Sequence, residues 1–391
     1  MENSYLFILG NHPNLSQMEI KNYLSFLEFN ASFSSVTPDI LLVNTKKNFQ
    51  PNELIKTLGG TIKIARVFKT ENQFELNYII DFLENTKKTK LDFGISFYNF
   101  DFGIRKILDL SKRVKKSLKN TNIKTNFTLG KNDGKLSSAQ VENKIIAKNG
   151  EEIIIVKTDN KIIYAQTQAI QNIRIFSQLD YGIPKACAKI GMLPPKLAQI
   201  MINISLPEKY SKGTIIYDPF CGTGRIILQS LFSGLEVYGS DINPNAVKNT
   251  IENSQWLNDN FKLQIKPDYF QKHIFIHDAT KPNNLKIKID SIVTEPSLGP
   301  ALKNMPREEE IKQIFNELKE LYLESFSHFK DNLKPNAKII CIFPKIGKNS
   351  LLDMIIDNIC SLGYYMVSNF EYKRDYQIVA RHIGVFSLSQ I

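Results

Sequence analysis

The 391-residue sequence predicts an α/β protein, and three observations carry that prediction. From Thr214 onward, short apolar runs alternate with helical stretches, which is typical of a mostly parallel sheet with crossover helices. Before that point, strands and helices follow each other in two smaller blocks, as in α+β folds. The length also exceeds that of one ordinary domain. We therefore divide the chain into residues 1–70, 71–168, a linker at 169–190, and residues 191–391.

The first block, residues 1–70, reads as strand, helix, strand, strand, helix and strand. YLFILG opens it as a strand, and NLSQMEIKNYL follows as a helix. Ser16 and Glu19 have the spacing of a capping box at the start of that helix. QPNELIKTLGG is a second capped helix, placed between the strands DILLVNT and TIKIARVFKT. Helices on one face of a small antiparallel sheet predict a ferredoxin-like domain.

The second block, residues 71–168, contains an amphipathic basic helix, GIRKILDLSKRVKKSLKN, followed by the helix SSAQVENKII and the hairpin EEIIIVKTDNKIIYAQTQ. The apolar side of the basic helix carries Ile104, Ile107, Leu108, Val114 and Leu118. Its basic side carries Arg105, Lys106, Lys112, Arg113, Lys115, Lys116 and Lys119. Residues 101–150 hold 12 Lys/Arg against 4 Asp/Glu, an excess of eight in a chain whose net charge is +11. This favours contact with a phosphate backbone; a solvated structural helix is the alternative.

The third block holds most of the predicted sheet. Pro194 and Pro195 open a helix from Lys196 to Ile204, because proline suits the first helical turn. The strands TIIYD, EVYGSD, IFIHD, DSIVTE and AKIICIF then alternate with apolar helical segments. YMVSNFEYK and ARHIGVFSL are expected to complete the sheet as an antiparallel hairpin.

Composition narrows the function classes. A net charge of +11 favours an anionic partner, most simply a nucleic acid. No apolar run approaches the ~20 residues that span a membrane, and the amino terminus lacks the pattern of a secretory signal. The cysteines form no CxxC pair and the histidines are scattered, so we expect no metal site and a cytoplasmic protein with free thiols. The cysteines are Cys187, Cys221, Cys341 and Cys360.

A glycine loop, in IIYDPFCGTGR, lies between a strand and a helix. Gly222 and Gly224 allow the backbone to approach a ligand closely. Acids end three successive strands, where ligands bind in such sheets: Asp218, Asp241 and Asp278. A dinucleotide fingerprint needs a third glycine where Ile227 stands, and an acid beside the loop would repel a pyrophosphate. The cationic methionine end of S-adenosylmethionine suits this edge, so we predict that cofactor.

Several of these segments together resemble one family. DPFCGTG, YGSDINPNAV, HDAT, GMLPPKLAQIMINI and the opening YLFILGNHPNLSQMEI are similar to the THUMP-containing tRNA guanine-N2 methyltransferases that modify position 10. The resemblance covers nearly the whole chain. It implies a Rossmann-like class I methyltransferase domain with a mostly parallel seven-stranded sheet, and a THUMP-like domain that grips the acceptor end of tRNA. Some relatives work with a small zinc-binding activator protein, and for this chain that partner is an open expectation.

The resemblance also implies roles for individual residues. The positions around the methionine end are Asp218, Gly222 and Gly224. Asp241 maps to the ribose contact and Asp278 to the adenine contact. The remaining residues assigned to the cofactor site are Phe220, Ile242 and Ala279.

The family has a D/N-P-P-Y/F motif after its fourth strand, and this chain has Glu295, Pro296, Ser297 and Leu298 there. In that motif, an acid or amide oxygen and a proline carbonyl accept the N–H bonds of a flipped guanine amine, and the aromatic ring stacks on the base. Glu295 and Pro296 are the predicted catalytic pair. Leu298 is the predicted base contact, although it lacks an aromatic face. Phe343, after the fifth strand, is the candidate for the missing ring.

These features predict an S-adenosylmethionine-dependent tRNA methyltransferase that acts on the N2 amine of a guanine, most simply at position 10. The basic helix and Leu298 are the expected tRNA contacts. One alternative is a catalytically inactive protein that binds tRNA or another RNA. The other is an amino-methyltransferase that acts on DNA or another RNA. The undamaged cofactor motifs favour an active enzyme, and the THUMP-like block argues against DNA.

Overall fold

The computed structural model describes residues 3–131, 134–186, 191–209, 211, 213–283, 285–374 and 377–388. The chain divides into two compact units. Unit 1 consists of Met1–Gln17 and Phe29–Arg174, and unit 2 of Met18–Glu28 and Ile175–Ile391. No helix within the described ranges is long and apolar enough to cross a membrane. The domain boundaries at residues 70, 168 and 190 stay predictions.

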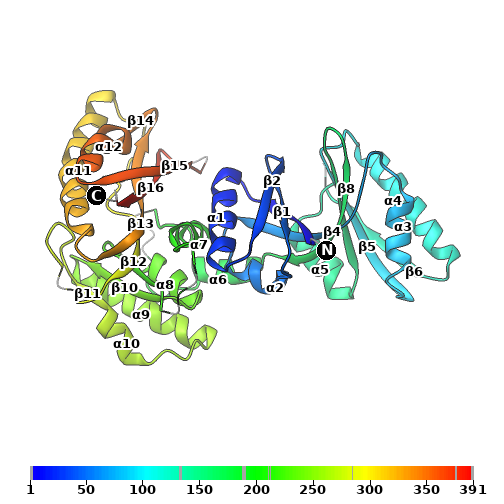
Figure 1. The fold of residues 1–391 in the computed structure, drawn as a ribbon, viewed down its shortest axis with the longest axis horizontal. Coiled ribbons are helices and arrows are strands. Elements are labelled where there is room, and N and C mark those ends of the chain that lie inside the picture. The colour runs from blue at the N-terminus through cyan, green and yellow to red at the C-terminus, as the bar shows by residue number, and fades with distance from the viewer. Residues whose placement is uncertain are drawn as a thin grey trace. The chain divides into compact units, whose positions relative to one another are not determined.

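One eight-stranded sheet organises unit 1, in the order β2-β3-β1-β4-β8-β7-β5-β6 (Figure 1). Its strands are β1 (Asn3–Leu9), β2 (Ala31–Thr37), β3 (Ile40–Thr45), β4 (Thr61–Glu71), β5 (Lys90–Tyr98), β6 (Lys124–Thr128), β7 (Glu151–Lys157) and β8 (Ile162–Ile170). β4 joins the two predicted blocks, because it pairs antiparallel with β1 on one side and β8 on the other. β5 pairs in parallel with β6 and β7, so the sheet is mixed.

The helices of the amino-terminal part are α1 (Pro13–Phe26), α2 (Pro51–Leu54), α3 (Asn77–Glu84), α4 (Ile104–Asn120) and α5 (Ser138–Lys144), with 3-10 turns at Ile55–Thr57 and Ile146–Lys148. The predicted capping box of α1 is wrong, because the helix already begins at Pro13. The Ser16 hydroxyl donates to the His12 carbonyl at 3.0 Å, and the buried Glu19 accepts from the Asn203 side chain at 2.8 Å. Pro13 stands at the first position of this helix, where its lack of an N–H group costs no hydrogen bond. The single turn α2 has no side-chain cap, so the predicted cap of this helix is wrong.

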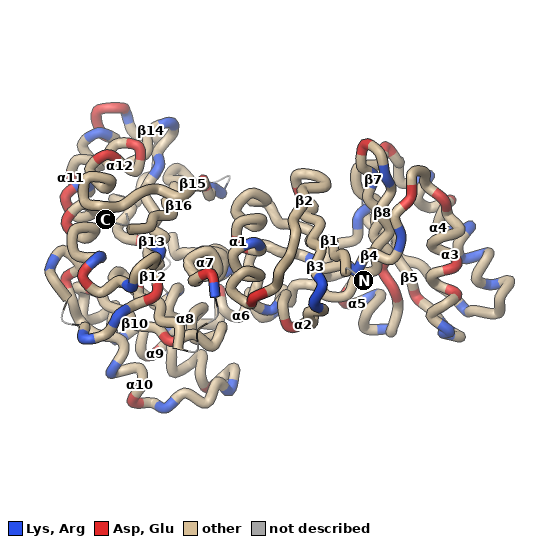
Figure 2. The backbone as a smooth tube through the Cα atoms, viewed as in Figure 1, with Lys and Arg blue, Asp and Glu red and all other residues tan. Residues whose placement is uncertain are grey.

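The predicted basic helix is present as α4, and basic residues recur along it (Figure 2). Its inner face buries Ile107, Leu110, Val114 and Leu118. Ile104, predicted on the apolar side, is 38% exposed because it stands in the first turn. Lys115 is half-buried, with Nζ 6.0 Å from the centroid of the Phe127 ring. The other predicted tRNA contacts on this helix are exposed, namely Arg105, Lys112, Arg113, Lys116 and Lys119.

A buried ion pair holds the middle of the unit 1 sheet. Lys63 on β4 and Glu152 on β7 meet at 2.6 Å, with side chains 2% and 0% exposed. The Glu152 carboxylate also accepts hydroxyl bonds from Ser96 on β5 at 2.7 Å and Thr167 on β8 at 2.6 Å. Lys63 donates to the Leu136 carbonyl at 2.7 Å. One hydrogen-bonded network therefore joins four adjacent strands.

A second sheet organises unit 2, in the order β11-β10-β9-β12-β13-β16-β15, with the short β14 paired to β13 (Figure 1). Its strands are β9 (Ile215–Asp218), β10 (Glu236–Asp241), β11 (Ile274–Ile276), β12 (Ile289–Thr294), β13 (Leu333–Ile346), β14 (Asn349–Ser350), β15 (Tyr364–Tyr372) and β16 (Val379–Leu388). The first five strands in the order run parallel, and β16 is antiparallel to both neighbours. The predicted α/β fold, with its mostly parallel sheet and closing antiparallel hairpin, is confirmed.

Helices cover both faces of this sheet. The helices that follow β8 in the chain are α6 (Ile173–Tyr181), α7 (Pro195–Ser205), α8 (Arg225–Phe232), α9 (Pro244–Phe261), α10 (Pro267–His273), α11 (Glu308–Phe329) and α12 (Leu351–Ser361). Neighbouring residues of β12 show the two sides, because side chains alternate along a strand. The Ser291 hydroxyl donates to Ser205 of α7 at 3.1 Å, whereas Ile292 belongs to the core formed with α11 and α12. The proline-opened helix predicted before the sheet is confirmed as α7.

Replacing Lys63 with methionine should destabilise unit 1, because Glu152 would keep a buried charge without its cation. Removal of one partner of a buried pair costs about 3–5 kcal/mol. Denaturant unfolding, followed by amide hydrogen exchange in β4, β7 and β8, measures the loss. Replacing Glu152 with leucine in the same variant should recover much of it, because an apolar pair carries no desolvation cost.

The matched control is Lys56→Met, which removes one partner of an exposed pair. Lys56 and Glu53 meet at 2.7 Å with side chains 51% and 70% exposed. Exposed pairs contribute about 0–1 kcal/mol, so this variant should unfold like the wild type. Equal and small effects of the two lysine replacements would contradict a stabilising role for the buried network.

Candidate active site

A cavity of about 880 Å³ opens at the carboxyl edge of the unit 2 sheet. Its wall includes the loop after β9, the end of β10, the loop after β12 and the start of β16. The predicted site residues that line it are Asp218, Phe220, Gly222, Asp241, Ile242, Glu295, Pro296 and Leu298. Gly224, Asp278 and Ala279 are not among its lining residues. The structure thus brings most of the predicted cofactor residues together with the predicted catalytic pair.

The glycine loop adopts a conformation that other residues rarely reach. Gly222 and Gly224 have φ of 54° and 89°, in the left-handed region. A Cβ on Gly224 would also lie 2.8 Å from a methyl group of Thr250. Thr250 fixes the loop further, because its hydroxyl donates to the Gly222 carbonyl at 2.8 Å. Gly224 therefore shapes the loop from behind, whereas Gly222 faces the cavity.

Asp218 is a buried acid in the cavity wall, 2% exposed. Its Oδ1 accepts hydrogen bonds from the Thr294 hydroxyl at 2.8 Å and the Phe220 amide at 3.1 Å. Burial raises the pKa of Asp218 to about 7, and the charges of Asp241 and Glu295 act in the same direction. A cationic ligand would favour the ionised form of this group, so the wall is suited to positive charge.

Asp241 holds the glycine loop through its carboxylate. Oδ2 accepts from the Gly222 amide at 3.0 Å, and Oδ1 accepts from the Asn243 amide at 2.9 Å. Each carboxylate oxygen keeps further acceptor capacity, which a ligand hydroxyl can use. Ile242, the next residue, is 66% exposed and offers an apolar surface beside this acceptor.

Asp278 stands at the neighbouring strand end. The His277 amide donates to the Asp241 carbonyl at 3.1 Å, which keeps the ends of β10 and β11 adjacent. The Asp278 carboxylate accepts from the Thr280 hydroxyl at 2.7 Å and the Thr280 amide at 3.0 Å. These bonds hold the pKa of Asp278 below its usual range. Ala279, which follows it, is buried.

The loop after β12 is anchored to the core beneath it. Tyr322 on α11 is buried, and its hydroxyl is within hydrogen-bond distance of the Ser297 carbonyl at 3.0 Å and the Ile342 carbonyl at 3.1 Å. Pro296 is buried, and Leu298 is half-buried in the cavity wall. Gly299 has φ of 91°, which turns the chain after Leu298. The loop residues that differ from the family motif therefore form a defined turn.

Glu295 has a partner that sequence reasoning missed. Arg381 Nε lies 2.6 Å from Glu295 Oε1, and the two side chains are 2% and 16% exposed. Burial raises the pKa of Glu295, while the charge and hydrogen bond of Arg381 lower it. The sequence held one signal, because an arginine interrupts the apolar strand ARHIGVFSL. A buried charge usually has a partner, but the sequence did not show which acid it would be.

Phe343 does not supply an aromatic face to the cavity, so that prediction is wrong. It is fully buried and stacks on Tyr322, with ring centroids 5.0 Å apart. Its side chain lies on the face of β13 that packs against α11, opposite to the face that α7 covers. Among the described residues that line the cavity, Phe220 alone is aromatic.

Arg225 is a second wall residue that the sequence did not reveal. It opens α8 and is 5% exposed. Its guanidinium donates to the main-chain carbonyls of Leu179 and Asp180 and lies 3.6 Å from the Met192 sulfur. It therefore connects the glycine loop to the segments before α7.

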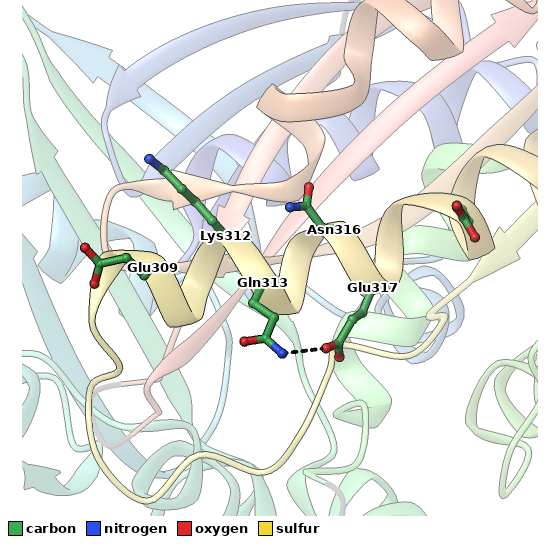
Figure 3. A pocket seen from close by; sticks show the side chains of 6 residues that line it. Glu309, Lys312, Gln313, Asn316 and Glu317 are labelled. Atoms are coloured by element: carbon green, nitrogen blue, oxygen red, sulfur yellow. Dashed lines mark hydrogen bonds between the residues drawn. The ribbon is translucent and has the colours of Figure 1, made fainter.

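A hollow along the exposed side of α11 is a weaker candidate (Figure 3). It is lined by Glu309, Lys312, Gln313, Asn316, Glu317 and Glu320. All six come from one helix, and Gln313 Nε2 donates to Glu317 Oε1 at 3.1 Å. Because no second element contributes a group, it lacks the convergence of a site.

Neither metal chemistry nor a disulfide is indicated in the described part of the chain. No group of three or more His, Cys, Asp or Glu that could hold a metal ion occurs there. Cys221 and Cys341 are buried free thiols and Cys360 is an exposed one, whereas Cys187 lies outside the described residues.

Several known proteins with similar sequences are named as methyltransferases or dimethyltransferases of guanine 10 in tRNA. No model of a known protein family matches the chain. It is 32% identical over 152 residues to a probable tRNA (guanine(10)-N2)-dimethyltransferase of Methanothermococcus thermolithotrophicus. The matched segment covers 35% of this chain and 83% of that protein. It is 30% identical over 165 residues to a tRNA (guanine(10)-N2)-dimethyltransferase of Methanothermobacter thermautotrophicus, covering 42% of each. The chain thus spans most of the first relative and less than half of the second.

Among solved structures, the fold is similar to that of TrmN from Thermus thermophilus. The TM-score is 0.52 at 13% identity, and the match covers 98% of this chain and 99% of that one. At this identity the likeness shows the fold alone, and it extends over both units. On the sequence relationship to the Methanothermococcus protein, the chain belongs to the family of the tRNA (guanine(10)-N2)-methyltransferases.

Proposed function

We propose that the protein transfers a methyl group from S-adenosylmethionine to the exocyclic N2 amine of guanine 10 in tRNA. The observation that carries this proposal is the single cavity that joins the glycine loop and its acids to the Glu295–Pro296 turn. A cofactor bound by the first part would present its methyl group to a base held by the second. The relatives named above support tRNA as the substrate and position 10 as the target.

The acids divide the cofactor between them. Asp218 and Asp241 both line the cavity, where Asp218 would face the cationic methionine part and Asp241 would accept from the ribose hydroxyls. Asp278 and Ala279 would complete the adenine end from the adjacent strand. Ile242, whose apolar side chain is exposed, would pack against the same ring. Supporting this division, the three acids end three neighbouring parallel strands.

The catalytic turn orients the target amine. The Glu295 carboxylate and the Pro296 carbonyl accept the two N–H bonds, which directs the nitrogen lone pair at the sulfonium methyl group. The bound cofactor would supply the methyl group, and the nitrogen would bond to its carbon as the carbon–sulfur bond breaks. The extra proton on the nitrogen leaves to solvent. Position and charge supply the acceleration, so no strong base is required.

Unit 1 supplies the grip on tRNA in this proposal. Its exposed basic residues on α4 bind backbone phosphates, and residues 71–168 act as the THUMP-like module. We place the protein with its substrate in the cytoplasm. A small zinc-binding activator remains an expectation, which a comparison of the purified chain with a co-purified complex would test.

A second candidate is a protein that binds RNA and cofactor without transferring a methyl group. Two observations favour it: Glu295 already makes an ion pair, and Leu298 offers no aromatic face. Stacking on an aromatic side chain contributes about 1–3 kcal/mol per base, so its loss weakens the hold on a flipped guanine.

A direct methylation assay separates the two candidates. Purified protein is incubated with methyl-labelled S-adenosylmethionine and a tRNA transcript that carries guanosine at position 10. We expect labelled N2-methylguanosine in the nucleoside digest. A transcript with adenosine at that position, and a compensating change in its paired base, should take no label. Glu295→Ala should lower the rate about 100-fold or more, because displacement by ~1 Å has that effect on an oriented reaction.

The matched control is Glu371→Ala, which removes an ion-paired carboxylate from the same sheet. Glu371 pairs with Lys345 at 2.6 Å and does not line the cavity. This variant should methylate at the wild-type rate. Intact binding of cofactor and tRNA without any label would favour the non-catalytic candidate, and label in both transcripts would show another target nucleotide.

Neutralising the exposed face of α4 should weaken tRNA binding and lower its salt dependence. In the triple variant Lys112→Gln, Arg113→Gln and Lys116→Gln, each lost phosphate contact should reduce the slope of log affinity against log salt by about 0.7–0.9. Fluorescence anisotropy with labelled tRNA at several salt concentrations measures the slope. Lys115 is left intact because it packs on Phe127.

The control removes three exposed lysines of unit 1 that lie outside α4, namely Lys46, Lys56 and Lys161. Net charge then changes equally in the two variants, so a general charge effect would lower both slopes alike. We expect the control slope to stay closer to that of the wild type. An unchanged slope in the α4 variant would make this helix a solvated surface only.

Cofactor affinity should rise with pH up to about 7 and then level off. The pKa of Asp218 is raised to about 7, so below that pH a proton must leave before the carboxylate can face the cation. The steepest expected change is tenfold per pH unit. In the absence of ligand the sign is opposite for stability: because the pKa of Asp218 is raised from 3.8 to about 7, stability falls as pH rises between these two values.

Isothermal titration calorimetry with S-adenosylmethionine at pH 5.5–8.5 measures this dependence. The Asp218→Asn variant keeps the shape of the side chain but cannot ionise. We expect it to bind more weakly and to lose the part of the pH slope that belongs to Asp218. A slope identical to that of the wild type would assign the titration to another group.

A further inference from the structure

Arg381 reaches the candidate site because of strand direction. β16 is antiparallel to β13, and its register pairs Arg381 with Pro344 near the end of β13. The first residues of β16 therefore lie at the edge where the parallel strands end. This register brings a guanidinium to the loop that follows β12.

The guanidinium of Arg381 has three acceptors, and all of them line the cavity. Nε donates to Glu295 Oε1 at 2.6 Å, and Nη2 donates to the Gly191 carbonyl at 2.7 Å. Nη1 donates to Gln377 Oε1 at 3.5 Å. One buried side chain thus connects the catalytic turn to two other parts of the wall. Its burial also limits screening of the ion pair by solvent.

We propose that Arg381 is a positioning residue for methyl transfer, which fixes one oxygen of Glu295 and leaves Oε2 as the acceptor for the target amine. This inference rests on the proposed function of the site. Glutamate has one more rotatable bond than aspartate, so a free carboxylate would sample several rotamers. The planar guanidinium has a fixed fork of donors, and its contact through Nε restricts that freedom.

The same contact favours the carboxylate form of Glu295. The groups that face Glu295 are Asp218 on β9, Tyr322 on α11, Cys341 on β13 and Arg381 on β16. Of these four, Arg381 is the cation, and a charged Asp218 repels negative charge on Glu295. Burial raises the pKa of Glu295 and Arg381 opposes that rise. A protonated Glu295 would lose acceptor capacity, so the partner cation preserves it.

A double-mutant cycle tests whether Arg381 acts through Glu295. The variants are Glu295→Gln, Arg381→Met and the double replacement, each assayed for kcat and for the KM of S-adenosylmethionine. We expect each single variant to lower kcat about 100-fold, with KM changed less than about threefold. The double variant should be no more than about threefold worse than either single one, because the two side chains act as a unit.

Independent roles predict a different result. A product of the two effects, about 10,000-fold, would overturn the proposal, since Arg381 would then act without Glu295. A higher KM for S-adenosylmethionine with unchanged kcat would also overturn it, because that pattern assigns Arg381 to cofactor binding. Arg381→Lys keeps the positive charge but lacks the planar guanidinium. We therefore expect its kcat to be about tenfold higher than that of Arg381→Met.

The matched control is Lys345→Met, which removes an ion-pairing cation from the neighbouring strand β13. It should leave kcat and the Glu295→Gln effect unchanged, because its partner is Glu371. Circular dichroism and cofactor calorimetry establish that each variant is folded. Should Arg381→Met not fold, the cycle is completed with Arg381→Lys, for which a product of the single effects again overturns the proposal.

A titration separates failure of this inference from failure of the proposed function. Carbon-13 NMR of labelled glutamate, assigned with Glu295→Gln, follows the Glu295 carboxyl with no need for turnover. Loss of Arg381 should raise its pKa by about one unit or more, which would also move the acidic limb of the kcat profile to higher pH. An unchanged Glu295 pKa would overturn the inference. An inactive wild type with the expected titration would overturn only the proposed function.

Discussion

The candidate site depends on one constraint, the shared direction of the strands in the unit 2 sheet. Because β9, β10, β11 and β12 run parallel, the residues that follow them gather at one edge. Asp218, Asp241 and the Glu295 turn reach the cavity for this reason. The antiparallel β16 obeys the same geometry in reverse, so its beginning, with Arg381, arrives at the edge where the others end. Strand direction thus brings together the four wall segments that these strands carry.

That gathering concentrates acids in a poorly solvated place. Asp218 is 2% exposed and has Asp241 and Glu295 as electrostatic neighbours, each of which disfavours its charge. Burial and like charge both favour protonation of such a group. Two cations can relieve this arrangement. Arg381 compensates the charge of Glu295 within the protein itself, whereas a cationic ligand would compensate the charge of Asp218 only when bound. The positive charge of the proposed cofactor therefore suits the electrostatics of the site.

The sequence predicted whatever depends on periodicity and spacing. Alternating apolar segments indicated the sheet, the crossover helices and the antiparallel end, and the basic periodicity of residues 104–120 indicated α4. The sequence did not predict features that depend on which side chains are in contact. Ser16 had cap spacing, yet Pro13 had already begun the helix. Phe343 lies within the expected strand, but its side chain is on the core side of that strand. The pairing of Arg381 with Glu295 joins residues 86 positions apart, and only the register of β16 determines it.

The variant turn can now be understood as one local solution. A shorter acid could present its carboxylate without a partner. Glutamate has an extra rotatable bond that needs a restraint, and the contact with Arg381 supplies that restraint. The missing aromatic face has no comparable substitute, since Phe343 is buried and Phe220 is the one ring among the described lining residues. Weaker stacking lowers the occupancy of the flipped base, and the binding of tRNA elsewhere on the chain can compensate for that. Orientation of the amine cannot be compensated from a distance, because it requires the reacting atoms to be placed to within about 1 Å. In the proposed mechanism, the ion pair rather than the lost ring is therefore the feature on which methyl transfer by this turn depends.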